Sequence, residues 1–162
     1  MSVLIQGSQQ RALLMGVRVE RAAATLPATT STAYFTVSGG RVIITSLIGE
    51  VTTACSATAT NLNLTVDPTG ANAAADLAAA TAITSDAVGT LYTVSGIPTD
   101  LLSAEKAGGT AVPNYVSGIL FNQGFIVPAG SILLKTSATN TGATKWSLTY
   151  IPYDDGASVA AA

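Results

Sequence analysis

The chain has 162 residues, enough for one ordinary domain that buries roughly two-thirds of its unfolded surface. Only 10% of the residues are charged, whereas soluble domains average about 25%, and the formal net charge is −2. Much of the outer surface must therefore consist of small uncharged residues. Such a surface is suited to being covered by neighbouring molecules.

The composition also argues against several kinds of partner. No stretch of about 20 residues is continuously apolar, and no basic segment precedes the first short apolar run, so neither a membrane span nor a secretory signal is expected. The seven basic residues are scattered from Arg11 to Lys145, which leaves no basic stripe for direct contact with nucleic acid.

Catalytic chemistry has few candidates in this chain. There is no histidine, the commonest general base and metal ligand, and the single cysteine, Cys55, cannot form an internal disulfide. Without a histidine to activate it, Cys55 is interpreted as a core or interface thiol. Asp154 and Asp155 are adjacent and point apart on an extended chain, so a solvated tail is favoured over a lattice contact or a shared Ca²⁺ site. No enzyme activity, catalytic residue, metal site or cofactor is expected.

Residues 1–12 are interpreted as an extended amino-terminal arm. They are mostly polar apart from the triplet Val3-Leu4-Ile5, so the arm is either frayed or tied down by a neighbouring subunit. A single β-sandwich domain is expected over residues 13–153. Within it, alternating valines and charged residues predict a first strand between Leu13 and Arg21.

A long hairpin is expected next. Its first arm begins at Tyr34, the Gly39-Gly40 pair supplies the turn, and residues 41–51 form the second arm. Both faces of that second arm carry aliphatic side chains, so one face must meet the core and the other a loop, an arm or another subunit. The two sets are Val42, Ile44 and Ile48, and Ile43, Leu47 and Val51. Together with the arm, the second set predicts an assembly interface made of Val3, Leu4, Ile5, Ile43, Leu47 and Val51.

The middle of the chain continues with short elements. Leu62, Leu64 and Val66 alternate with polar residues and predict a strand with one buried face. The alanine-rich residues 71–82 are expected to form a loop followed by a strand, because strands surround them. Another short strand is expected at 91–94, and an N-cap with good helix formers predicts one short surface helix over Thr99–Lys106. Residues 111–122 form a linker or insertion.

The last two predicted strands lie between Gly124 and Tyr153. They are separated by the polar loop from Lys135 to Lys145 and are expected to pair with each other. In the second of them Trp146, Leu148 and Tyr150 share one face, which predicts that they are core residues. Residues 154–162 lack bulky side chains and are expected to form a flexible tail.

Short strands separated by glycine, proline, asparagine and aspartate predict an all-β protein. The expected architecture is an antiparallel β-sandwich with one short surface helix, and a jelly roll is one form that the pattern allows.

Four segments carry a resemblance to a known group of proteins. The most specific is the ending KWSLTYIPYDDG within Lys145–Ala162, and the others are Phe35–Ala54, Ala87–Gly96 and Val127–Trp146. Together they look like a group of small structural proteins encoded by tailed bacteriophages, described as virion or head proteins. The resemblance implies a virion component, assembled in the cytoplasm of the bacterial host, with decoration or cementing of the head surface as its role.

The expected partners follow from this role. They are further copies of the chain, in a small cyclic oligomer such as a trimer, and the lattice of the major capsid protein. An alternative is a tail-tip or surface-exposed adhesin whose aromatic side chains, drawn from Trp146, Tyr150 and Tyr153, meet host glycan. A cell-wall hydrolase would need an acid and base pair that the sequence does not offer.

Overall fold

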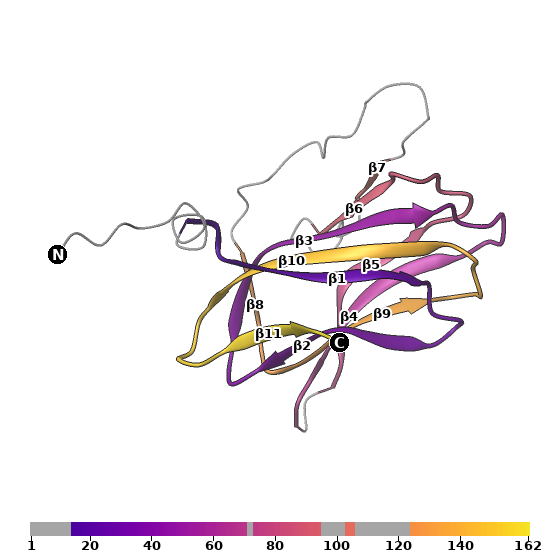
Figure 1. Ribbon diagram of the computed structural model, residues 1–162. Helices are drawn as coiled ribbons and strands as arrows, with labels where there is room; N and C mark the ends of the chain where they lie inside the picture. The colour runs from indigo at the N-terminus through magenta and orange to yellow at the C-terminus, as the bar shows by residue number, and fades with distance from the viewer. Residues whose placement is uncertain (1–13, 71–72, 95–102, 106–123) are drawn as a thin grey trace.

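The computed structural model describes residues 14–70, 73–94, 103–105 and 124–162. Within these residues, eleven strands form two antiparallel sheets that face each other across one hydrophobic core (Figure 1). The predicted all-β sandwich is confirmed. No helix in the described ranges is long and apolar enough to cross a bilayer.

Each sheet collects strands from distant parts of the sequence. Sheet A has the order β1 (Val17–Thr25), β10 (Ala143–Pro152), β3 (Val42–Thr53), β6 (Leu91–Thr93) and β7 (Ser103–Glu105), and β8 (Phe125–Val127) also pairs with β3. Sheet B has the order β11 (Ser158–Ala161), β2 (Ser31–Ser38), β9 (Gly130–Thr136), β4 (Asn61–Pro68) and β5 (Ala75–Ala82). Most strands therefore have their neighbours along the chain in the opposite sheet.

Trp146 is the largest side chain of the core and is only 2% exposed. It lies opposite Gly49 of β3, where the absence of a side chain leaves room for the indole ring. Tyr34 meets the ring edge-on and Tyr92 stacks on it, each with ring centroids 6.3 Å apart. The indole nitrogen donates a hydrogen bond to Thr144, so no polar atom of the ring is left without a partner.

The period-two patterns give the inward faces of several strands. Leu148 and Tyr150 lie beside Trp146 on the buried face of β10, and Leu62, Leu64 and Val66 form the buried face of β4. The alanine-rich segment ends in β5, as the expected loop followed by a strand requires. These strands were recognisable because one face is apolar and the other polar.

Both predicted hairpins are wrong. β2 lies in sheet B and β3 in sheet A, and likewise β9 lies in sheet B and β10 in sheet A. Gly39 and Gly40 have φ values of 76° and 143°, and they carry the chain from one sheet to the other instead of folding it back within a sheet. The same glycines would allow a hairpin or a crossing to the other sheet. Pairing with distant strands decides which of the two forms.

The predicted flexible tail at residues 154–162 is also wrong, and the sandwich extends to Ala161. Residues 158–161 form β11, which pairs with β2 at the edge of sheet B. Ala157 and Val159 are buried, and the amide of Ala162 donates to the carbonyl oxygen of Tyr34 at 3.1 Å. A short edge strand needs backbone hydrogen bonds more than bulky side chains, so small residues did not reveal it.

The predicted surface helix is not found in the described part of its range. Ser103–Glu105 form β7, which pairs with β6, because backbone pairing with an existing strand outweighs helix propensity in so short a segment. The rest of the predicted helix, the arm at residues 1–12 and the linker at 111–122 lie outside the described residues.

The open edges of the two sheets are poor templates for further strands. The register of β1 is broken between Arg21 and Ala24, and the pairing of β5 with β4 is broken twice. The other strands that end a sheet in the described ranges, β7, β8 and β11, have only three or four residues. Bulges and short edge strands oppose backbone pairing between molecules.

Candidate assembly surface

Three isoleucines lie side by side on the outer face of sheet A. The strand register places Ile43 of β3 opposite Ile151 of β10 on one side and opposite Ile126 of β8 on the other. Directly opposite residues have Cβ atoms about 4.5–5.5 Å apart, so the three side chains form a continuous row. Ile126 is 53% exposed and Ile151 is 37% exposed. Ile43, between them, is half-buried, and Gly124 lies against its side chain.

Two further exposed apolar residues, Leu14 and Met15, lie where the chain passes this face of the sheet. The side chain of Thr45 donates to the carbonyl oxygen of Met15 at 3.1 Å, which holds the chain against the outer face of β3. A Cβ on Gly16 would lie 2.4 Å from the backbone oxygen of Tyr150, so this close approach requires glycine. Leu14 and Met15 are 83% and 65% exposed. We call the five residues the isoleucine patch: Leu14, Met15, Ile43, Ile126 and Ile151.

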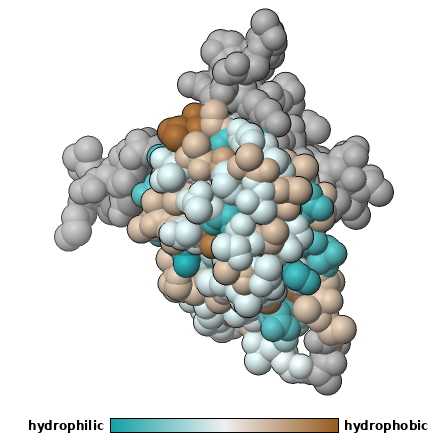
Figure 2. Space-filling view, turned by 90° about the vertical axis from the view of Figure 1, so that its right-hand side faces the viewer, coloured by the Kyte–Doolittle hydropathy of each residue, from teal (hydrophilic) through white to brown (hydrophobic). Residues whose placement is uncertain are grey.

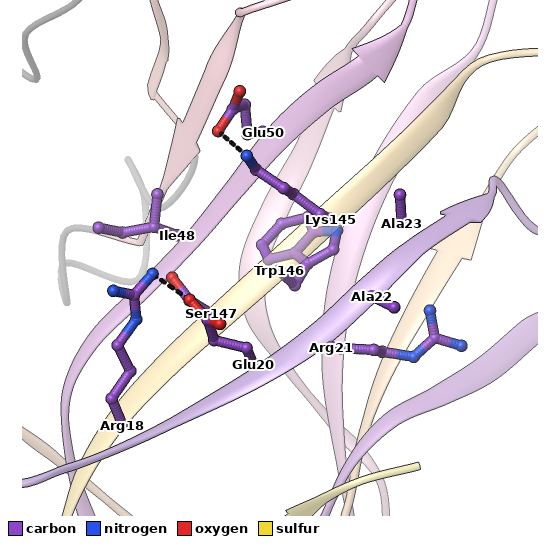
Figure 3. Close-up of a pocket in the computed structure, with 10 residues that line it drawn as sticks. All are labelled: Arg18, Glu20, Arg21, Ala22, Ala23, Ile48, Glu50, Lys145, Trp146 and Ser147. Atoms are coloured by element: carbon purple, nitrogen blue, oxygen red, sulfur yellow. Dashed lines mark ion pairs between the residues drawn. The ribbon is translucent and has the colours of Figure 1, made fainter.

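A shallow hollow of about 600 Å³ lies on the same sheet, around the side chains drawn in Figure 3. Two ion pairs stand on its rim: Arg18 with Glu20 of the same strand at 2.5 Å, and Lys145 with Glu50 of the neighbouring strand at 2.8 Å. Each carboxylate is already matched by a cation from the same molecule. The charges of these four groups therefore cancel.

The low charge of the sequence is visible on the folded surface. The side of the molecule turned toward the viewer in Figure 2 is mostly pale, and its strongly hydrophilic residues are scattered rather than gathered. This agrees with the 10% of charged residues in the chain. Such a surface neither steers nor repels a charged partner strongly.

Asp154 forms a compact ion pair with Arg41, contrary to the expected solvated tail. Its carboxylate accepts from Nε and Nη2 of Arg41 at 2.9 and 2.8 Å and from the Arg41 backbone amide at 2.8 Å. These hydrogen bonds lower the pKa of Asp154 to about 2. The Arg41 guanidinium also lies 4.7 Å from the ring centroid of Tyr153. The cluster therefore fixes the β10–β11 turn against the crossing from β2 to β3.

Replacing Asp154 with asparagine should lower the thermal midpoint at pH 7, because a neutral amide cannot form this ion pair. The carboxyl pKa falls from 3.8 to about 2 on folding, so the stabilisation is complete above about pH 4 and is lost as the pH falls through about 2. The difference in midpoint between wild type and Asp154→Asn should shrink over that range in thermal scans. Asp155→Asn is the matched control, and a pH-independent difference for Asp154→Asn would contradict the assignment.

Cys55 lies in a buried polar cluster and not in an accessible site. Burial raises the pKa of its thiol, which keeps the sulfur protonated and unreactive. The hydroxyl of Tyr92 donates to Oδ2 of Asp86 at 2.8 Å, and both side chains are fully buried. Burial, followed by the hydrogen bond to Asp86, raises the pKa of Tyr92 far above its ordinary value. The cluster is closed to solvent, so its role is structural.

The predicted interface residues separate into three groups. Val3, Leu4 and Ile5 lie outside the described residues, and Ile43 lies in the isoleucine patch. Leu47 and Val51 are 2% and 0% exposed, so their assignment to the interface is wrong.

A bulge in β3 explains the error at Leu47 and Val51. Thr149 of β10 pairs with Ser46 and Tyr150 pairs with Ile44, which leaves Thr45 as an extra residue. The extra residue reverses the alternation of side chains in the part of β3 after Thr45. Side chains that the sequence assigned to the outer face therefore point into the core. By the same reversal Ile48, expected on the face of Val42 and Ile44, lies on the outer face.

Two members of the patch could have been recognised from the sequence. Ile151 is an aliphatic residue on the otherwise polar face of the strand that contains Trp146. Ile126 lies between two neighbours in β8 whose side chains face the core. An apolar residue among the outward-facing residues of a strand indicates that the outer face of the sheet is covered there. Leu14 and Met15 carry no such periodic signal.

The described residues contain no group of three or more histidine, cysteine, aspartate or glutamate side chains that could hold a metal ion. Comparisons of the chain with protein-family models, with curated proteins and with solved structures found no match.

Proposed function

We propose that the protein is a non-enzymatic structural component of a tailed-phage virion, a decoration or cement protein that binds the head lattice as a small oligomer. The isoleucine patch is the observation that carries the proposal. It places three isoleucines on a rigid sheet face, and two more exposed apolar side chains just before β1, on a molecule with few charges, which is the chemistry of a surface that becomes covered. The resemblance of four segments, KWSLTYIPYDDG among them, to small structural proteins of tailed bacteriophages supports the same role.

The strand order supports a jelly roll as the form of this sandwich. A jelly roll has eight strands in two four-stranded sheets, built from two Greek keys. The orders β1-β10-β3-β6 and β2-β9-β4-β5 fit this plan, with consecutive strands alternating between the sheets except at the β4–β5 pair. β11 then adds a further strand to one edge. A stiff two-layer block of this kind keeps an assembly surface in fixed geometry.

The proposed protein stabilises a shell by mass action. A molecule that binds the assembled lattice and not its separated parts adds its binding free energy to the lattice. Modest contacts suffice, because they are repeated over many equivalent positions. The partners are further copies of this chain, in a ring such as a trimer, and the major capsid protein. Assembly in the host cytoplasm and a final place on the head surface belong to the same proposal.

The proposal is tested by mixing the purified protein with expanded head shells of the phage that encodes it. Wild-type protein should sediment with the shells and raise their disassembly temperature. The double variant Ile126→Ser and Ile151→Ser should lose at least about tenfold in affinity, about 1.4 kcal/mol, because copies that lack the apolar surface no longer bind the lattice together as one oligomer.

Val88→Ser is the matched control, because Val88 is 57% exposed and lies near the other end of β3, beside Val51. It should bind as the wild type does. A wild-type protein that stays monomeric and does not bind the shells would overturn the proposal. Density for the protein on intact particles would place it on the head or on the tail.

One observation favours the alternative of an adhesin. Tyr153 is 52% exposed and its ring is held by Arg41, which leaves an aromatic surface available to a sugar. Trp146 and Tyr150 are buried and cannot contribute to such a site. Binding to a glycan array that is lost in Tyr153→Ala would favour the adhesin over the decoration protein.

A further inference from the structure

We propose that the isoleucine patch is covered, in the oligomer, by the segment Val3-Leu4-Ile5 of a second copy of the chain. The inference rests on the proposed function because it requires copies to associate. It names the partner of the patch and the way in which the copies are joined.

The first step is that the patch, and not a sheet edge, is the surface available for joining. The long edge strands β1 and β5 have broken registers, and the other edge strands in the described ranges are three or four residues long. By contrast, Ile126, Ile43 and Ile151 present a row across three hydrogen-bonded strands. An occupant must therefore offer apolar side chains to a sheet face.

The second step is the place where the undescribed start of the chain meets the structure. Residues 1–13 lead into Leu14, which is itself the most exposed member of the patch. The nine residue steps from Ile5 to Leu14 can span up to about 30–32 Å, whereas three adjacent strands are only about 10 Å across. The segment can therefore extend well beyond its own row, as contact with the equivalent row on a neighbour requires.

The third step is chemical match. Val3, Leu4 and Ile5 are three consecutive aliphatic residues, and the first charged residue of the chain is Arg11. Their aliphatic, uncharged side chains match in chemistry a row of three isoleucines that carries no charge. In a cyclic oligomer each copy would donate one segment and receive one, so the exchange closes and leaves no row uncovered. If each segment covered its own row instead, the row could not join the copies.

Mixing two variants that each carry one added cysteine tests the exchange directly. Leu4→Cys and Ile126→Cys, combined under mild oxidation, should give a disulfide-linked dimer on a non-reducing gel at least about ten times faster than Leu4→Cys combined with Val88→Cys. The native Cys55 is 6% exposed and its pKa is raised by burial, so it stays out of the reaction. No preference for Ile126→Cys over Val88→Cys would overturn the inference.

The double variant Leu4→Cys and Ile126→Cys separates the possible occupants. Exchange predicts linked oligomers, whereas a cross-link confined to monomers would show that the segment covers its own row and would overturn the inference. Faster linkage with Leu120→Cys in place of Leu4→Cys would show that the residues before β8 cover the row. That result would also overturn the inference. Ile126→Cys chains that link to each other as fast as they link to Leu4→Cys would indicate that two patches contact each other directly. That result would overturn the inference too.

A second measurement uses the full chain with no added cysteine. The triple variant Val3→Ser, Leu4→Ser and Ile5→Ser should have the mass of a monomer by light scattering, with an unchanged thermal midpoint for the sandwich. Gln6→Ser, Gln9→Ser and Gln10→Ser together are the matched control and should leave the oligomer intact. A cross-link without shell binding would refute the decoration role alone, and shell binding without a cross-link would refute this inference alone.

Discussion

Replacing Trp146 with alanine should lower the free energy of unfolding by about 3–5 kcal/mol, as expected for removal of a fully buried aromatic side chain. The indole is 2% exposed and contacts Tyr34 and Tyr92, so its loss would leave a cavity between the two sheets. Urea denaturation followed by far-UV circular dichroism measures the change without depending on tryptophan fluorescence. Ser147→Ala, on the outer face of the same strand, should change stability by less than about 0.5 kcal/mol.

Gly49 provides an independent test of the same packing. A Cβ at this position would lie 2.5–2.7 Å from three ring atoms of Trp146, so Gly49→Ala should destabilise the protein by about 1–3 kcal/mol through overpacking. The cost should shrink when Trp146 is also replaced by leucine, because the smaller side chain makes room for the methyl group. Strictly additive effects in the double variant would show that the two residues do not share this space.

Tyr92→Phe should lower the free energy of unfolding by about 1–3 kcal/mol, because it removes the hydroxyl that donates to the buried carboxyl group of Asp86. The hydrogen bond is 2.8 Å long and both side chains are 0% exposed, so water cannot replace the lost donor. The exposed Tyr153→Phe is the matched control. Equal stability of Tyr92→Phe and wild type in urea denaturation would show that this pair contributes nothing.

The same pair predicts a dependence on alkaline pH. The pKa of Tyr92 is raised above its ordinary value of 10.0 in the folded protein, chiefly by burial. Its contribution is therefore complete below about pH 10, where the unfolded side chain is still protonated, and falls as the pH rises further. Denaturation curves between about pH 9 and 11 should show a smaller loss of stability for Tyr92→Phe than for the wild type.

Strands were predictable from this sequence, whereas their assignment to sheets was not. The inward faces of β4 and β10 follow from period-two alternation, which depends only on local sequence. The choice between a hairpin and a crossing to the other sheet depends on distant partners: β2 finds β9 and β11, and β3 finds β10. Gly39-Gly40 permits either path, so the turn alone carries no information about it.

The assembly surface was predictable only in part, for a related reason. Ile43 lies on the outer face of β3, but one extra residue at Thr45 turns Leu47 and Val51 inward. A bulge has no clear signature in a strand whose two faces are both aliphatic. Ile126 was not recognisable as a neighbour of Ile43, because 83 positions of sequence separate two residues that the sheet places side by side.

The irregular and short borders of the two sheets have a consequence for crowding. Copies held at high local density, as on a densely covered particle, meet one another with few straight backbone edges in the described part of the chain. Growth of a continuous hydrogen-bonded ladder from molecule to molecule, the first event in fibre formation, is thereby obstructed. The fold can thus tolerate close packing of many identical neighbours while remaining a set of discrete, correctly folded units.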